Sequence, residues 1–131
     1  MDNSNLNNEI MGESMLDSLK KRIPYNENLH KTKEDYDFLL ETLIEDSINI
    51  GLSLKYPFND YSDKTLPKKY NNWAIRCACE LYNLAGNENI KSYSENGLNW
   101  EKFKSGLSTD LINEIVPSVG TIQSESVIED V

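Results

Sequence analysis

Apolar residues recur every three or four positions along two long stretches of this chain, which is the spacing of one face of an α-helix. The first stretch lies between Lys33 and Lys55, directly after Thr32, which is a favourable N-cap residue. Its apolar or small residues are Tyr36, Leu39, Leu40, Leu43, Ile44, Ile48, Gly51 and Leu52. We therefore expect a long helix over residues 33–55.

The second stretch predicts a helix over residues 66–86. Its apolar face consists of Tyr70, Trp73, Ala74, Cys77, Ala78, Leu81, Leu84 and Ala85. Pro67 suits the first turn of a helix, and Gly86 can end one in a left-handed conformation. Because apolar faces of this length must be buried, we expect the two long helices to pack on each other.

Two short helices are expected near the ends of the chain. Apolar side chains share one side over about residues 13–22, and Pro24 then stops that helix. A final helix is expected to start at Ser108 and to end at Pro117, with apolar residues on one side.

The Asn96-Gly97 dipeptide predicts a tight turn, because both residues adopt positive φ readily. Placing it at the centre of a β-hairpin over about residues 90–104 puts Tyr93 opposite Trp100 on one face. A lone two-stranded hairpin is not stable in water, so either a neighbouring subunit or the helical bundle must cover at least one of its faces. We therefore predict that Tyr93 and Trp100 lie at an interface with another protein chain.

These elements predict a mainly α fold. It is a small helical bundle with two long antiparallel helices, a protruding hairpin, a short C-terminal helix and an extended tail. The expected organisation is a flexible N-terminal arm over 1–12, a helical domain over 13–117 and a tail over 118–131. The apolar points through which the tail would contact a partner are Ile122, Val127 and Ile128.

Composition narrows the functional classes. The chain has 131 residues and a net charge of −9, which argues against a DNA-binding protein that reads sequence through a basic patch. No apolar run approaches the ~20 residues of a membrane span, and the first residues do not form an export signal, so we expect a protein made in the cytoplasm. Cys77 and Cys79 point away from each other on a helix, which favours two reduced thiols.

One face of the first long helix carries a stripe of four acidic residues, Glu34, Asp37, Glu41 and Glu45. Like charges at this spacing repel one another weakly. Three interpretations are open. The stripe is an ordinary solvated face, a surface that contacts lysines of another chain, or the lining of a surface at which negative charge has a function.

No catalytic, cofactor or metal-binding pattern is recognisable. A glycine-rich phosphate loop, a nucleophile with a nearby histidine and a cluster of ligands at metal spacing are all missing. We therefore predict that the protein is not an enzyme and needs no cofactor.

Four segments in this order resemble the small head–tail connector proteins of tailed bacteriophages, also called adaptor or head-completion proteins. They are the acidic helix DYDFLLETLIEDSINIGLSL, the Pro-started helix LPKKYNNWAIRCACELYNLAGNENI, the Ser-rich segment KSYSENGLNW and the closing helix LSTDLINEIVP. The resemblance covers about residues 33–117. The chain departs from the family pattern in its longer Asn-rich N-terminal arm and in lacking a strongly basic closing segment.

The resemblance implies a ring of identical subunits, usually dodecameric, that sits below the portal ring in the virion neck. The genome passes through such a ring without sequence-specific binding, with the portal protein above and a stopper or tail-completion protein below. A ring also needs two complementary faces on each subunit, and the acidic stripe and the lysines of the predicted hairpin, Lys91, Lys102 and Lys104, fit that need.

A second hypothesis uses the same acidic stripe differently. A small acidic helical module can bind a basic cleft on another protein, as an inhibitor or a DNA mimic does. The mass of the protein with and without a candidate portal would separate the two hypotheses.

Overall fold

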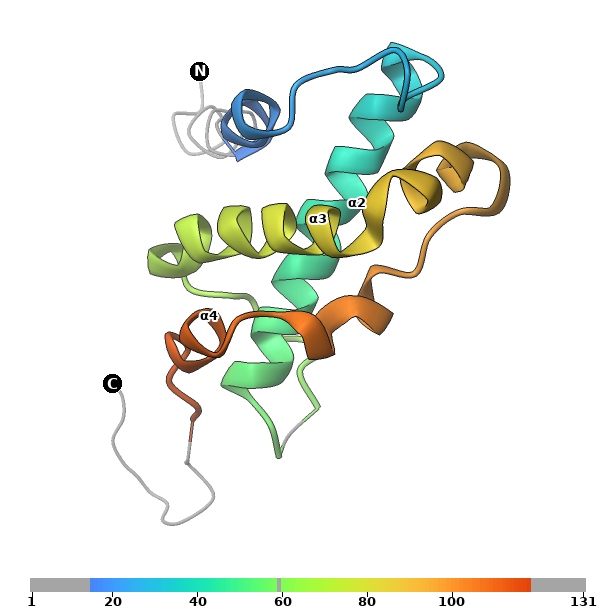
Figure 1. Ribbon diagram of the computed structural model, residues 1–131. Helices are drawn as coiled ribbons and strands as arrows, with labels where there is room; N and C mark the ends of the chain where they lie inside the picture. Colours follow the sequence, from blue (N-terminus) through green and yellow to red (C-terminus); the bar gives the residue numbers. More distant parts are fainter. Residues whose placement is uncertain (1–14, 59, 119–131) are drawn as a thin grey trace, which may run out of the picture.

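The computed structural model describes residues 15–58 and 60–118, and Figure 1 shows that these residues are arranged as packed helices. Residues 15–22 are helical, as expected. The further elements are α2 (Lys33–Lys55), the 3₁₀ helix η1 (Lys68–Tyr70), α3 (Asn71–Asn96), the 3₁₀ helix η2 (Trp100–Gly106) and α4 (Thr109–Asn113). No strand occurs within these two ranges, and the prediction of a mainly helical fold is confirmed. The predicted arm over 1–12, the predicted tail beyond Ser118 and its three apolar residues lie outside the described residues.

Helix α2 has the predicted bounds because its first turn is capped. The Thr32 hydroxyl accepts a hydrogen bond from the backbone N–H of Asp35 at 3.0 Å, which satisfies one of the free donors of the first turn. At the other end, the backbone N–H of Tyr56 donates to the Leu52 carbonyl. The buried face includes Tyr36, Leu39, Leu40, Leu43, Ser47, Ile50, Gly51 and Leu52.

Helix α3 crosses α2 at a wide angle, so the two long helices do not run side by side as an antiparallel pair (Figure 1). Small residues line the contact, including Gly51 on α2 and Ala74 and Ala78 on α3, and all three are buried. A Cβ atom at Gly51 would lie 3.0 Å from the Trp73 ring. Close approach at one point therefore fixes the crossing, and the larger apolar side chains pack around it.

The predicted β-hairpin over 90–104 is wrong. Gly86 does adopt positive φ, at 80°, but the chain re-enters a helix at once and continues to Asn96. Gly97 also has positive φ, at 70°, and its N–H caps that helix by donating to the Tyr93 carbonyl at 2.7 Å. The glycine is therefore used as a helix C-cap and not as part of a two-residue turn.

Burial of apolar side chains explains why the segment before Gly97 forms a helix and not a strand of a hairpin. Ile90 and Tyr93 are three residues apart, so both lie on one face of a helix, and the structure leaves them only 3% and 8% exposed. A protruding hairpin would leave such side chains in water, whereas the helix places them in the core of the domain.

Tyr93 and Trp100, which were predicted to lie at an interface with another protein chain, are instead buried within this chain. Trp100 is fully buried, and its indole N–H donates to the Thr42 hydroxyl at 3.3 Å. The Tyr93 hydroxyl lies 3.4 Å from the same Thr42 oxygen. Both rings therefore belong to the core of the single chain, because the chain turns back after α3 and η2 packs on both α2 and α3 (Figure 1).

The closing helix α4 starts after Ser108, as predicted, and the Ser108 hydroxyl accepts the N–H of Leu111. Several contacts hold it on α3, among them the hydrogen bonds from the backbone N–H and hydroxyl of Ser108 to the Glu80 carboxylate. The indole of Trp73 donates to the Leu111 carbonyl at 2.6 Å, and Arg76 pairs with Glu114 through two hydrogen bonds of 2.5 and 2.6 Å. None of the helices in the described part of the chain has both the length and the apolar composition that a membrane crossing requires.

Candidate interaction surfaces

The exposed side of α2 carries three of the four predicted acidic residues around an aromatic ring. Glu34, Phe38, Glu41 and Glu45 are spaced four, three and four residues apart, so they share one face of the helix. All four are exposed, and the Phe38 side chain is 59% exposed. We call these four residues the acidic face.

Asp37, the fourth predicted member of the stripe, lies at the edge of this face. Its carboxylate pairs with the Lys20 ammonium of the N-terminal helix at 3.0 Å. Both side chains are more than a third exposed, so the pair contributes at most about 1 kcal/mol. Asp37 therefore helps to seat the helix 15–22 on α2 within the same chain.

Sequence reasoning missed Phe38. The signal was available, because Phe38 falls four residues after Glu34 and so shares its face and not the buried face of Tyr36 and Leu39. In the structure its ring stands beside the ring of Tyr93, with 6.2 Å between centroids. Exposed aromatic side chains surrounded by charged ones are typical of residues that anchor protein interfaces.

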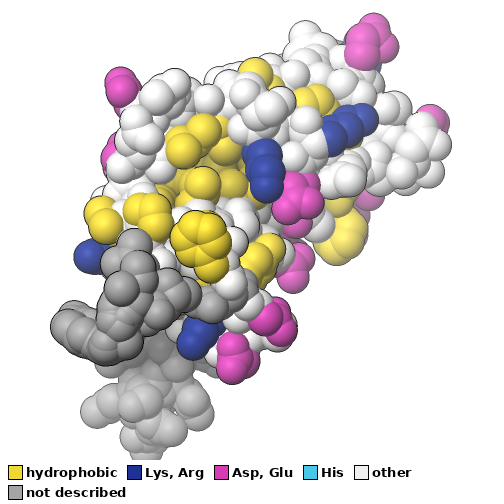
Figure 2. All heavy atoms as spheres, turned by 90° about the horizontal axis from the view of Figure 1, so that it is seen from below, with side chains coloured by type: hydrophobic (Ala, Val, Ile, Leu, Met, Phe, Trp, Pro, Cys, Tyr) yellow, Lys and Arg dark blue, Asp and Glu magenta, His cyan; other side chains and the backbone are white. Residues whose placement is uncertain are grey.

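A second exposed surface lies at the C-terminal end of α2. Phe58 is 74% exposed and Val116 is 62% exposed. Val116 is held near the end of α2 because its carbonyl accepts from the Lys55 ammonium at 3.3 Å, and Ser118 N–H donates to the Lys55 carbonyl. Figure 2 shows hydrophobic side chains gathered on this side of the molecule. We call Phe58 and Val116, with the exposed prolines Pro57 and Pro117, the apolar end.

The three predicted interface lysines are all exposed, but they do not sit on a hairpin. Lys91 belongs to the second half of α3, whereas Lys102 and Lys104 belong to η2. The Lys102 ammonium lies 5.3 Å from the centre of the Phe103 ring, and Lys104 lies 4.0 Å from the Glu101 carboxylate. Their charges therefore stay available to a partner, since neither contact is buried.

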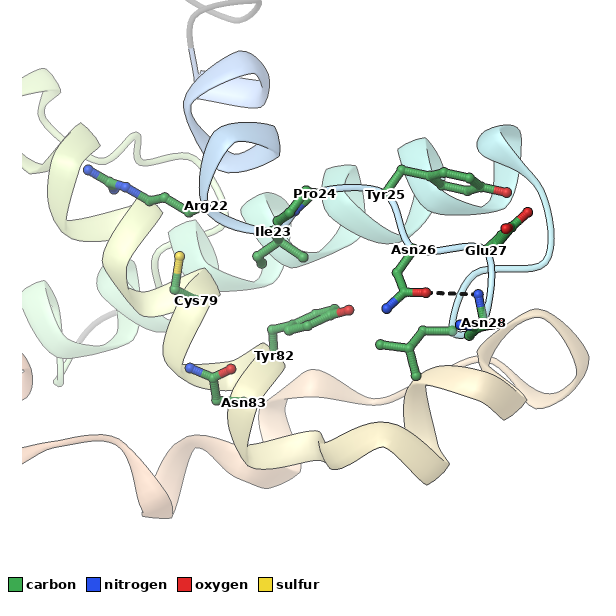
Figure 3. Close-up of a pocket in the computed structure, with 11 residues that line it drawn as sticks. Arg22, Ile23, Pro24, Tyr25, Asn26, Glu27, Asn28, Cys79, Tyr82 and Asn83 are labelled. Atoms are coloured by element: carbon green, nitrogen blue, oxygen red, sulfur yellow. Dashed lines mark hydrogen bonds between the residues drawn. The ribbon is translucent and has the colours of Figure 1, made fainter.

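A groove of about 570 Å³ lies between α3 and the segment that links the helix 15–22 to α2 (Figure 3). It is lined by residues 22–29 on one side and by Cys79, Tyr82 and Asn83 of α3 on the other. Figure 3 shows the Tyr82 ring reaching across from α3 toward Asn26. The groove thus offers an aromatic ring and side-chain amides, which are suited to hydrogen bonding.

The two thiols of α3 are poor nucleophiles. Burial raises the pKa of Cys77 to about 12, and it also raises the pKa of Cys79, although Arg22 opposes that shift. Both thiols are therefore protonated near neutral pH, and protonated thiols do not attack substrates or bind metals. Within residues 15–58 and 60–118, no group of three or more His, Cys, Asp or Glu side chains is placed to hold a metal ion.

Comparison of this chain with models of protein families, with curated proteins and with solved structures found no match. The resemblance to phage connector proteins therefore rests on the residues of the chain and on their order.

Proposed function

We propose that this protein is a structural adaptor that forms a ring beneath the portal of a tailed phage, joins the DNA-filled head to the tail and extends the DNA channel. The observation that supports this proposal best is the presence of two chemically different exposed surfaces, one on α2 and one beside its C-terminal end. The acidic face lies on the N-terminal half of α2, and the apolar end lies where α2 finishes. At a rise of about 1.5 Å per residue, Phe38 and Lys55 are about 25 Å apart along the helix.

A closed ring of identical subunits joins two different faces of each subunit, because its contacts are head-to-tail. A rigid helix that carries one face and ends at the other is suited to this role, since it keeps them at a fixed separation. The proposal assigns the acidic face to the contact with a neighbouring subunit or to the wall of the channel. It assigns the apolar end to the portal protein or to the stopper or tail-completion protein.

The order of the helices also supports the proposal. The acidic helix, the Pro-preceded helix and the closing helix of the family pattern correspond to α2, α3 and α4. The net charge of −9 fits a channel wall, because lysines that neutralise phosphates would hold the DNA in place. The proposed location is the neck of the virion, after assembly in the host cytoplasm.

Charge reversal at Glu41 tests the role of the acidic face. Glu41→Lys changes the middle of the face without touching the core, and Glu88→Lys on α3 is a matched control because Glu88 is also exposed. If the face pairs with a neighbouring subunit, sedimentation velocity will show weaker assembly of the Glu41 variant, in a way that depends on salt. If it lines the channel, the variant will assemble normally and retain DNA that wild type and the control release.

The same surface supports one alternative, a small acidic module that binds a basic cleft. Three carboxylates and an exposed aromatic ring on one helix face could mimic a short stretch of DNA or fill an apolar pocket with a basic rim. Glu41→Lys would then weaken a complex of one module with one partner and would not affect any ring. An unchanged result in all three measurements would identify the acidic face as a solvated surface.

A further inference from the structure

The segment that links the helix 15–22 to α2 is fixed at three points. We call residues 23–31 the strap. At its start, the Tyr36 hydroxyl donates to the Ile23 carbonyl at 2.6 Å. At its end, the Lys31 ammonium pairs with Glu95 on α3 at 2.8 Å. His30, next to Lys31, provides the third attachment, which joins the strap to the middle of α3.

His30 is the only histidine of the chain, and it is buried, with 3% of its surface exposed. Its Nδ1 accepts a hydrogen bond from the backbone N–H of Asn26 at 3.0 Å. An Nδ1 that accepts must be unprotonated, so the proton of the neutral ring lies on Nε2. Nε2–H then donates to the Tyr82 hydroxyl, 2.9 Å away.

We propose that His30 is a pH-sensitive latch, which keeps the strap folded against α3 when the imidazole is neutral and destabilises this closed form when the ring binds a proton. The proton would go to Nδ1, the atom that accepts from Asn26. Two donors would then face each other, so the hydrogen bond that folds the strap between Asn26 and His30 would be lost, whereas Nε2–H would still be able to donate to Tyr82. Because residues 22–29 form one wall of the groove and Tyr82 belongs to the other, release of the strap would open the groove.

Some groups around His30 stabilise its protonated form, and others destabilise it. The rings of Tyr36, Tyr25 and Tyr82 lie 4.9, 5.8 and 6.2 Å from the imidazole, and aromatic faces can attract a cation. Charged residues come from all sides. Lys31 of the strap, Asp35 of α2 and Lys91 of α3 line a crevice with His30, Lys33 lies over the Tyr25 ring, and Glu27 of the strap lines the neighbouring groove.

Burial is the main influence on the protonation of His30. It lowers the pKa of His30 below the ordinary value of 6.5, because a buried imidazolium loses its hydration. A histidine whose pKa is lower in the closed state than in the open state contributes fully to closing only at pH values above its pKa in the open state. The contribution of His30 therefore decreases as the pH falls below about 6.5. The equilibrium constant for closing the strap on α3 then drops by up to tenfold for each unit by which the two pKa values differ.

Nuclear magnetic resonance of the full chain tests the latch directly, because a single histidine gives a single set of imidazole signals. At pH 7.5 the ¹⁵N shifts should identify the Nε2–H form. On titration to pH 5.5 the amide shift of Asn26 should follow the imidazole with the same midpoint, below 6.5, and amides of the strap should lose hydrogen-exchange protection relative to Ile50 in the core of α2. His30→Gln, which cannot titrate, should abolish this dependence of the strap on pH.

Tyr82→Phe is the matched control, because it keeps the ring and removes only the hydroxyl that accepts from Nε2. Strap protection should then decrease at pH 7.5, while Asn26 should still follow the titration of His30. An Nδ1–H form at pH 7.5, a midpoint at or above 6.5, or a strap that responds to pH identically in wild type and His30→Gln would overturn the proposal. The measurements on wild type decide the question even if the glutamine variant does not fold.

Discussion

Thr42 shows how much of the fold depends on contacts between single residues that are far apart in the sequence. Its hydroxyl donates to the Leu39 carbonyl at 2.8 Å, so its lone pairs are free to accept. The indole of Trp100 and the hydroxyl of Tyr93 both reach this oxygen. One hydroxyl on α2 thus provides the polar partner that two buried aromatic side chains require.

The first prediction at this scale concerns Trp100. Trp100→Ala should lower the free energy of unfolding by about 3–5 kcal/mol, because it removes a fully buried ring and leaves a cavity. Urea unfolding measures this loss. Phe58→Ala is the matched control, since its ring is 74% exposed, and it should change stability by no more than about 0.5 kcal/mol. A Trp100→Ala variant as stable as wild type would show that the ring is not part of the core.

The environment of a single residue could be predicted only where its neighbours in the structure are also close to it in the sequence. The carboxylates Glu34, Glu41 and Glu45 are exposed on one face, as their spacing indicated. The pairing of Asp37 with Lys20 was not predictable, because it depends on how two separate helices meet. His30 likewise sits in a segment that reads as a polar connection, and only the fold brings it to Tyr82.

At the scale of elements, Gly86 divides α3 into two helical parts. Its φ of 80° and ψ of 166° lie in a region that is essentially restricted to glycine. A Cβ added there would meet no atom within 4 Å, so any cost of a side chain comes from the backbone and not from crowding. This break lets Ile90 and Tyr93 reach the core.

A substitution at this position tests the role of the break. Gly86→Ala should lower the free energy of unfolding by about 1–3 kcal/mol, even though alanine is the better helix former, because the backbone must be strained or must straighten. Asn87→Ala, at the next exposed helical position, should be neutral or slightly stabilising. Thermal unfolding followed by circular dichroism compares the two. If Gly86→Ala is the more stable variant, the positive-φ conformation at this position is not required.

The helices that could be predicted are those whose capping residues and apolar spacing are consistent with the side chains that the fold buries. The Thr32 cap and the apolar spacing gave the bounds of α2, and Ser108 gave the start of α4. The prediction for the segment around Asn96-Gly97 was wrong because the dipeptide favoured a turn, while burial of Ile90 and Tyr93 favoured a helix. Positive φ at a glycine serves a helix cap as well as a hairpin, so the dipeptide alone could not decide.

At the scale of the whole molecule, the account depends on the two exposed surfaces of α2. The acidic face carries Phe38 among three carboxylates, and the apolar end carries Phe58 and Val116. These three side chains are among the most exposed large apolar residues of the described chain, and exposed apolar groups that gather in one place often mark contact sites. A subunit with two unlike contact sites assembles head-to-tail into a ring when its rotation closes.

The most direct test of this account is the mass of the full chain at micromolar concentration, alone and mixed with a candidate portal ring. We predict a species whose mass is a whole multiple of the 15.0 kDa subunit, near twelve copies as the connector family implies, either free or bound to the portal. If the acidic face contacts a neighbouring subunit, Phe38→Ser should reduce this species relative to wild type while the subunit stays folded. A chain that remains a 15.0 kDa monomer at every concentration, with and without the portal, would contradict the proposed function.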